Sequence, residues 1–185
     1  MSALEGVEQE GLDRPPPGWA EPIVRGSTRL PARFRSALAT ERGTSDHREA
    51  RSDALIAFRK LIRGVPLKPW DYRPAWTLAV ICAAHPRLHD TEHGATVPTA
   101  LRAVRTRDGY EIHLRRLLDA DRQELLDRIP GVCAQIAAAK GTLDLLRLAW
   151  ALDGWGHPAR YVQRMWAQEG WPADLDGRIE RRVAQ

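Results

Sequence analysis

The sequence predicts an all-α protein, a compact helical bundle of about eight or nine helices, with two small helical subdomains as an open alternative. From residue 50 onward, apolar residues recur three and four positions apart, which is the spacing of one face of an α-helix. No stretch alternates apolar and polar residues with a period of two, and no hairpin dipeptide joins two apolar runs. The 185 residues are 43% hydrophobic and 28% charged, which is typical of a globular chain.

The beginning of the chain is expected to be an irregular leader that is rich in proline and glycine. The prolines at 15–17, together with several glycines, disfavour regular structure over residues 1–28. One short helix is expected over 30–39, and residues 40–49 are expected to form a loop. The predicted division of the chain is a leader over 1–49 and a helical domain over 50–185, which comprises a basic part over 50–107 and a C-terminal helical bundle over 108–185.

The first helix of the main domain is expected to begin at Ser52 or Asp53, since either residue can cap a helix. It is expected to run to Arg63, because Gly64 and Pro66 are typical of a helix end. Further helices are expected over 75–84, 98–106, 110–118, 121–140 and 173–183. Two more are expected between the last two of these, one that is capped by Thr142 and one that begins at Pro158.

Local signals predict further details of these helices. Asp121 followed by Glu124 resembles a capping box, in which each side chain accepts a hydrogen bond from the backbone N–H of the other residue. Gly109 is expected to separate two helices, and Pro130 is expected either to kink the helix that contains it or to lie in a local irregularity. The mostly apolar segment 75–84 is expected to lie at the centre of the core.

The charge of the chain is unevenly distributed. The formal net charge is only +4, and 25 of the 28 basic residues are arginine. Residues 51–116 carry 12 basic and 6 acidic side chains, whereas the segments on either side are near neutral. A basic segment of this kind indicates a surface that binds a polyanion. The alternative is that arginine simply replaces lysine throughout the chain as a bias of composition.

Several classes of protein are not supported by the sequence. There is no phosphate-binding glycine loop, no HExxH, no GxSxG and no CxxC. Cys82 and Cys133 cannot form a disulfide framework, and the longest apolar run is about half of the ~20 residues that span a bilayer. The N-terminus lacks a signal pattern. We therefore expect a cytoplasmic protein that is not an enzyme, with no cofactor, membrane association or small-molecule substrate.

A cluster of possible metal ligands lies in the middle of the chain. Cys82, His85, His89 and His93 are spaced so that imidazoles four apart on a helix could share a zinc ion. Pro86 follows the first histidine, however, and favours a loop without helical register. No metal is therefore expected, and a metal-dependent enzyme remains the least favoured alternative.

Basic residues at helical spacing are the main candidates for binding. A guanidinium group offers a fixed fork of donors that suits phosphate oxygens, and such contacts carry no sequence information. Arg122 is expected to be structural, and the C-terminal tryptophans at 150, 155, 166 and 171 are expected to pack in the core. Gln163 is expected to face solvent. The candidate nucleic-acid-binding residues are Arg59, Lys60, Arg63, Arg102, Arg105, Arg128, Arg160 and Arg164.

Five segments resemble motifs of the CasB family, the small subunit of the type I-E CRISPR Cascade complex. His113–Arg122 is similar to the family's "RRF-x-x-LL-x-A-D" helix, and Thr142–Trp155 is similar to its "DW-x-x-LL-x-DL-x-x-W" segment. His157–Ala167 resembles the closing "P-x-R-x-VQRRWA" helix. Ala54–Gly64 and Trp76–Pro86 resemble the early "A-LRRGL" and "LALHP" helices.

The resemblance implies a small, helical, non-catalytic subunit of an antiviral ribonucleoprotein complex. Its partners would be the crRNA, the target and displaced DNA strands of the R-loop, the backbone and large subunits, and a second copy of itself. Carried over by position, Arg59 and Lys60 match paired basic residues of the family, and Arg128, Arg160 and Arg164 match its later arginines. The alternative is an assembly scaffold whose arginines bind acidic protein partners without direct nucleic-acid contact.

A departure from the family pattern concerns the helices expected after Thr142 and after Pro158. Trp150 and Met165 stand where the family often has arginine. The resemblance therefore implies a thinner basic surface there than is usual for the family.

Overall fold

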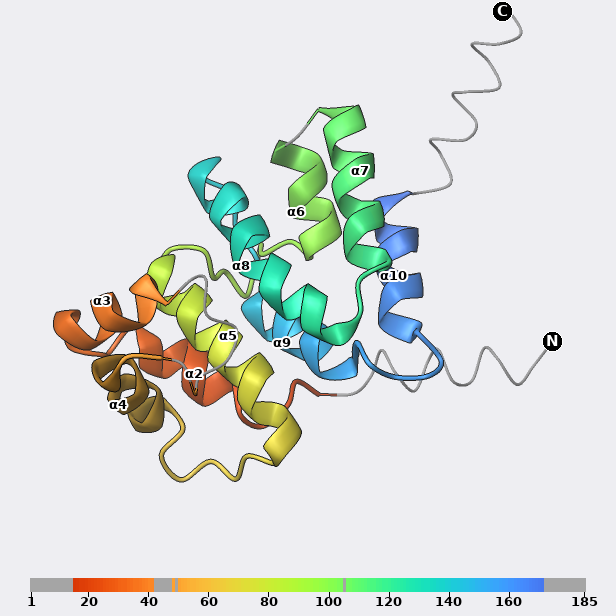
Figure 1. The fold of residues 1–185 in the computed structure, drawn as a ribbon. Coiled ribbons are helices and arrows are strands. Elements are labelled where there is room, and N and C mark those ends of the chain that lie inside the picture. The colour runs from red at the N-terminus through yellow and green to blue at the C-terminus, as the bar shows by residue number, and fades with distance from the viewer. Residues whose placement is uncertain (1–14, 42–47, 49, 105, 172–185) are drawn as a thin grey trace, which may run out of the picture.

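The computed structural model describes residues 15–41, 48, 50–104 and 106–171, and this part of the chain forms nine α-helices and one 3-10 helix, with no strand (Figure 1). The all-α prediction and the expected number of helices are therefore confirmed. The helix expected over 173–183 lies outside the described residues. The α-helices are α2 (Ala20–Ser27), α3 (Ala32–Thr40), α4 (Ser52–Leu61), α5 (Tyr72–Ala84), α6 (Val97–Val104), α7 (Arg107–Leu118), α8 (Arg122–Ala138), α9 (Leu145–Gly154) and α10 (Tyr161–Gly170).

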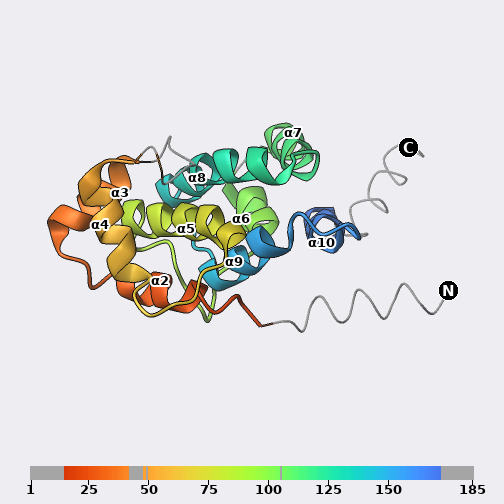
Figure 2. The same cartoon turned by 60° about the horizontal axis from the view of Figure 1, so that its bottom comes forward.

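Helix α5 lies at the centre of the fold, as its composition predicts. Every residue from Pro74 to Ala83 is buried, because the sequence offers an apolar side chain on every face of this helix. It packs against α2, α3 and α4 on one side and against α8 and α9 on the other (Figure 2). Within the described ranges, no helix combines the length and the hydropathy that a bilayer crossing needs.

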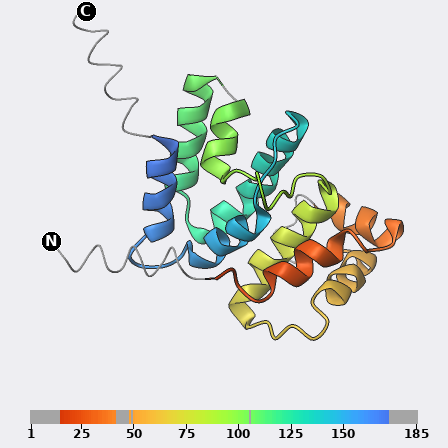
Figure 3. The ribbon, with the colours of Figure 1, turned by 180° about the vertical axis from the view of Figure 1, so that it is seen from behind.

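Helix α2 corrects the expectation that residues 1–28 are irregular. Trp19, Ile23 and Val24 are buried against the rest of the core, and Figure 3 shows α2 lying along α5 at the back of the molecule. Pro22 is compatible with this helix because it occupies the first turn, where the backbone N–H groups have no partner within the helix. The short helix expected over 30–39 is present as α3.

Several helix boundaries differ from the sequence predictions by a few residues. The N-cap of α4 is Arg51, and Ser52 is already its first helical residue. Gly109 lies inside α7 and does not separate two helices, since the cost of a glycine within a helix is only about 1 kcal/mol. The cap of α9 is Asp144, whose carboxylate accepts hydrogen bonds from two backbone N–H groups, and not Thr142.

The C-terminal helices are held together by aromatic side chains. Trp155 is buried, its Nε1 donates to the carbonyl of Ala120 at 3.0 Å, and its ring lies 4.9 Å from that of Trp166 between centroids. The capping box predicted at the start of α8 is confirmed, because Asp121 and Glu124 each accept from the backbone N–H of the other. Helix α8 continues through Pro130 to Ala138.

A substitution at the end of α8 should change the stability of the protein. Lys140 has a left-handed φ of 59°, a conformation that costs a residue with a Cβ about 1–2 kcal/mol. The backbone N–H groups of Lys140 and Gly141 donate to the carbonyls of Ala137 and Ile136, which closes the helix. We expect Lys140→Gly to raise the free energy of unfolding by about 0.5–1 kcal/mol, after the greater freedom of unfolded glycine is subtracted. Urea denaturation measures the change.

The control for this prediction is Lys140→Ala, which removes the same exposed side chain but keeps the Cβ. This variant should gain no stability. A lower stability of Lys140→Gly than of Lys140→Ala would contradict the assignment of strain to this position.

Candidate nucleic-acid interface

Three of the candidate residues lie together at the end of α4 and form what we call the α4 group: Arg59, Lys60 and Arg63. All three side chains are exposed, and Arg59 and Arg63 lie one helical turn apart in sequence. Neither of these two guanidinium groups makes an ion pair or a side-chain hydrogen bond with another described residue. The structure therefore brings together the first three predicted contacts, and no carboxylate among the described residues pairs with Arg59 or Arg63.

The aromatic ring of Phe34 anchors this region to α3. The Lys60 ammonium lies 5.1 Å from the ring centroid and the Arg33 guanidinium lies 4.5 Å from it, so both cations contact its π-system. Phe34 itself is buried. Arg33 is thus a further cation beside the α4 group that sequence reasoning did not select. The sequence feature that could have identified Arg33 is its position immediately before Phe34 on the same helix.

A second set of arginines surrounds the C-terminal end of α7, and we call it the α7-end cluster: Arg115, Arg116, Arg128 and Arg160. Arg115 and Arg116 lie in the last turn of α7 itself. Arg128 of α8 donates to the carbonyl of Arg116 at 2.8 Å, and Arg160 donates to the carbonyl of Leu118 at 2.7 Å. These carbonyls have no partner within the helix, and cations are favoured at this end of the helix dipole.

The sequence predicted Arg128 and Arg160 as binding residues but not this structural role. Arg160 precedes α10 with a left-handed φ of 50°, and its guanidinium ties the start of α10 to the end of α7. Arg128 also lies 3.7 Å from the Glu124 carboxylate. Arg115 and Arg116 were missed as candidates, although an adjacent arginine pair in the last turn of a helix is a readable signal. A groove of about 520 Å³ between α7 and α8 runs past Arg116 and Arg128.

The remaining predicted residues lie on α6 and α10. Arg102 is exposed, and its Nη1 lies 3.4 Å from the carbonyl of Glu169 near the end of α10. Arg164 is exposed on α10. Arg105 lies outside the described residues. The helices that carry these residues pack together, because α10 contacts both α6 and α7.

The α4 group and the α7-end cluster do not form one continuous strip. Figures 1 and 2 show α3 and α4 at one end of the molecule, and α7 and α10 at the other. The described surface therefore offers two separate basic regions. A single strand of nucleic acid that touched both would have to run along the length of the bundle.

Other predictions about α10 and the tryptophans have mixed outcomes. Trp150, Trp155 and Trp166 are buried, which confirms the prediction of core packing for these three, whereas Trp171 is only half-buried against the core. Gln163 was expected to face solvent, but it is buried because its Nε2 donates to the carbonyl of Trp155 at 2.8 Å. Arg122 is half-buried beside the carbonyl of Trp70, at 3.5 Å, as expected for a structural residue.

The histidine segment that follows α5 is a loop without helical register, as the sequence predicts. Within the described residues, no three His, Cys, Asp or Glu side chains are grouped so that they could hold a metal ion. His89 instead accepts a hydrogen bond on Nδ1 from the backbone N–H of Leu145, at 3.2 Å. The N–H groups of His93 and Glu92 lower the pKa of Asp90. Burial raises the pKa of the Cys82 thiol to about 12.

Comparison with known proteins finds one matching family model and two similar crystal structures. A family model described as CRISPR-associated protein Cse2 matches residues 30–171. The crystal structure of CasB from Thermus thermophilus is similar with a TM-score of 0.70 and 23% identity, over 83% of this chain and 98% of that chain. A second crystal structure, of a CRISPR-associated protein of the Cse2 family from Thermus thermophilus, is similar with a TM-score of 0.69 and 21% identity, over the same shares of the two chains. No curated protein matches the sequence significantly.

Proposed function

The chain belongs to the CRISPR-associated Cse2 family, and on that premise we propose that it is the non-catalytic small subunit of a type I-E Cascade complex that holds nucleic acid without reading its sequence. The nucleic acid would be the crRNA–target duplex and the displaced DNA strand of the R-loop. The other partners would be the backbone and large subunits of the complex and a second copy of this chain.

The α4 group is the observation that carries this proposal. Its two arginines are exposed, lie in the last turn of α4 and in the turn that follows it, and have no counter-charge among the described residues. Free guanidinium groups of this kind bind phosphate oxygens, which are present in every sequence. R-loop formation is a nearly balanced exchange of one duplex for another, so a few backbone contacts to the displaced strand are enough to favour it.

The test of this proposal compares Cascade complexes reconstituted with and without this subunit. The complex that contains the subunit should hold a target R-loop longer, and the logarithm of the affinity should fall linearly with the logarithm of salt concentration. Displaced strands of different sequence should give the same gain. An R-loop lifetime that is identical with and without the subunit would refute the proposed role.

A scaffold that binds acidic protein partners is the second candidate, and one observation favours it. Ile56 on α4 and Ile112 on α7 are among the few large apolar side chains that are exposed, and each lies on a helix that also carries exposed arginines. An apolar residue beside cations suits a protein surface with carboxylates. In that case the subunit would assemble into the complex normally, but the salt dependence of R-loop lifetime would not change when it is left out.

A further inference from the structure

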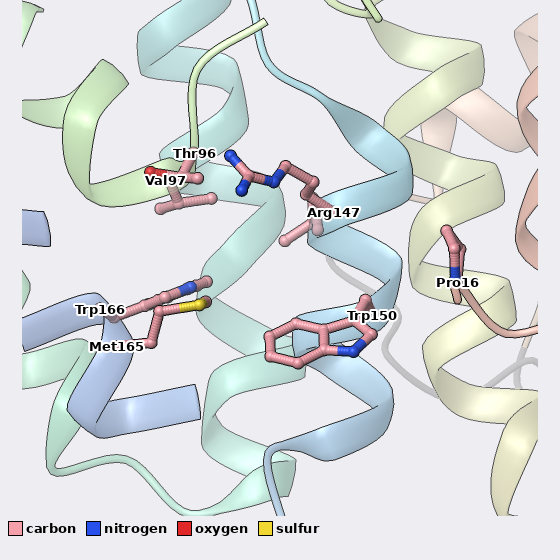
Figure 4. Close-up of a pocket in the computed structure, with 8 residues that line it drawn as sticks. Pro16, Thr96, Val97, Arg147, Trp150, Met165 and Trp166 are labelled. Carbon is pink, nitrogen blue, oxygen red and sulfur yellow. The ribbon is translucent and has the colours of Figure 1, made fainter. Parts of the chain in front are cut away.

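Trp70 is the tryptophan whose side chain lies most in solvent. Of the seven tryptophans, five are buried and Trp171 is half-buried, whereas Trp70 is 58% exposed. Figure 4 shows two of the buried rings, those of Trp150 and Trp166, beside a pocket between α9 and α10. Single exposed apolar residues are common on protein surfaces, so exposure alone assigns no role to Trp70. Its surroundings do.

The turn that carries Trp70 is fixed by hydrogen bonds. It is a single turn of 3-10 helix, η2 (Pro69–Asp71), between α4 and α5. The N–H of Lys68 donates to the Asp71 carboxylate at 3.0 Å, and the N–H of Asp71 donates to the carbonyl of Lys68 at 2.9 Å. The carbonyl of Trp70 lies 3.5 Å from the guanidinium of Arg122 on α8. The backbone therefore holds the indole in place, and a ligand that binds it need not order a loop first.

Cations lie beside this exposed ring. The Lys68 ammonium lies 5.4 Å from the centroid of the Trp70 ring, and no carboxylate among the described residues pairs with it. Arg122 adds a positive charge next to the backbone of Trp70. Arg73 differs from these two, because it lies 3.7 Å from the carboxylate of Asp127. An exposed indole next to an unpaired ammonium suits a ligand that joins an aromatic ring to an anion, as a nucleotide does.

Trp70 also lies between the two basic regions of the surface. It follows Arg63 of the α4 group by seven residues, so at most about 25 Å separate the two Cα atoms. Arg122, which contacts Trp70, precedes Arg128 of the α7-end cluster by six residues on α8, a rise of about 9 Å. In Figures 1 and 3 the connection from α4 runs along the lower edge of the molecule to the start of α5, which lies between α4 and α10. A strand that joined the two regions would therefore pass Trp70.

We propose that Trp70 stacks one unpaired base of a single strand that runs from the α4 group to the α7-end cluster, with Lys68 on a neighbouring phosphate. The inference rests on the proposed function and names a contact within it. Every base has an aromatic face, so stacking holds a strand without reading its sequence. A cation–π contact at an exposed site is weaker than the stacking of a base, so a base displaces the ammonium from the ring and leaves it free for a phosphate.

Two strands with the same phosphates, one with bases and one without, test this proposal. The full chain is titrated with a fluorescent oligothymidylate and with an abasic deoxyribose-phosphate strand of the same length. The oligothymidylate should bind about tenfold more tightly, because only this strand can stack. Trp70→Ala should bring the ratio close to one by weakening the oligothymidylate alone. Trp70→Tyr keeps a ring and should restore most of the ratio.

Further variants separate stacking from charge and from apolar bulk. Trp70→Leu keeps an apolar side chain without a ring and should match Trp70→Ala, so the test holds even if the alanine variant fails to fold. Ile112→Ala removes an exposed apolar side chain of α7 and should leave both affinities unchanged. Lys68→Gln should weaken both strands about fivefold and lower the slope of log affinity against log salt by about 0.7, the value for one phosphate contact.

The possible outcomes separate this inference from the proposed function. If both strands bind the parent chain with equal affinity and with salt dependence, or if Trp70→Ala keeps the tenfold ratio, the stacking contact is refuted and the proposed function stands. If Trp70→Ala impairs assembly with protein subunits and leaves the strand ratio unchanged, Trp70 binds protein and the inference is wrong. If neither strand binds in a salt-dependent way, the proposed function fails together with the inference.

Discussion

Reversing the charge of Arg59 and Arg63 should lower the affinity of the full-length chain for single-stranded DNA by about 10- to 100-fold. Both side chains are exposed and neither one stabilises another described element, so the substitutions Arg59→Glu and Arg63→Glu should leave the fold intact. Phosphates that contacted a guanidinium would then face a carboxylate, and like charges placed together are costly. The slope of log affinity against log salt should fall by about 1.4 for the two lost contacts.

The matched control is the double variant Arg25→Glu and Arg29→Glu. It changes the net charge by the same amount, but on α2 and the turn that follows it. Fluorescence anisotropy with a labelled oligonucleotide at several salt concentrations measures both variants. An equal loss of affinity in the control would show that total charge controls binding, and that the α4 group is not a specific contact.

Arg160 and Arg128 would be poorer choices for such an experiment. Each donates a short hydrogen bond to a carbonyl at the end of α7, so each substitution would leave that carbonyl without a donor. A loss of binding could then result from movement of α10 or α8. The sequence alone could not show this, because 42 residues separate Arg160 from the carbonyl to which it donates.

The parts of the fold that were predicted correctly depend on local signals. The capping box at Asp121 involves residues three apart, and the apolar surface of α5 can be read from one continuous segment. Helix α2 was missed because Pro22, Gly26 and the prolines before the helix outweighed the spacing of Trp19, Ile23 and Val24, which forms an apolar face. Gln163 was misplaced because the acceptor that allows its burial lies on the preceding loop.

The candidate site also contains a part that local sequence signals predict and a part that depends on long-range packing. The α4 group was predicted from neighbours on one helix, and the structure keeps these residues together on one surface. The α7-end cluster joins α7, α8 and the start of α10, and it exists only because the last carbonyls of α7 need donors.

Trp155→Ala should lower the free energy of unfolding by about 3–5 kcal/mol, which is a large part of the stability of a domain of this size. The change leaves a cavity beside Trp166 and removes the donor to the carbonyl of Ala120. It also loosens the backbone at position 155, whose carbonyl accepts a hydrogen bond from the Gln163 side chain. Trp155→Phe keeps a ring in contact with Trp166 and should lose less. Ile112→Ala, at an exposed position of α7, should change stability by less than about 0.5 kcal/mol.

Two probes in one urea titration also test whether the helices unfold as one unit. Cys82 of α5 and Cys133 of α8 are both buried, and burial raises the pKa of both thiols, so neither should react with a thiol reagent at pH 8 until the core opens. Helix α5 packs against helices from both halves of the chain. Thiol labelling and far-UV circular dichroism should therefore report the same midpoint, and Trp155→Ala should shift both equally. Separate midpoints would instead support two helical subdomains, with the damage confined to α7–α10.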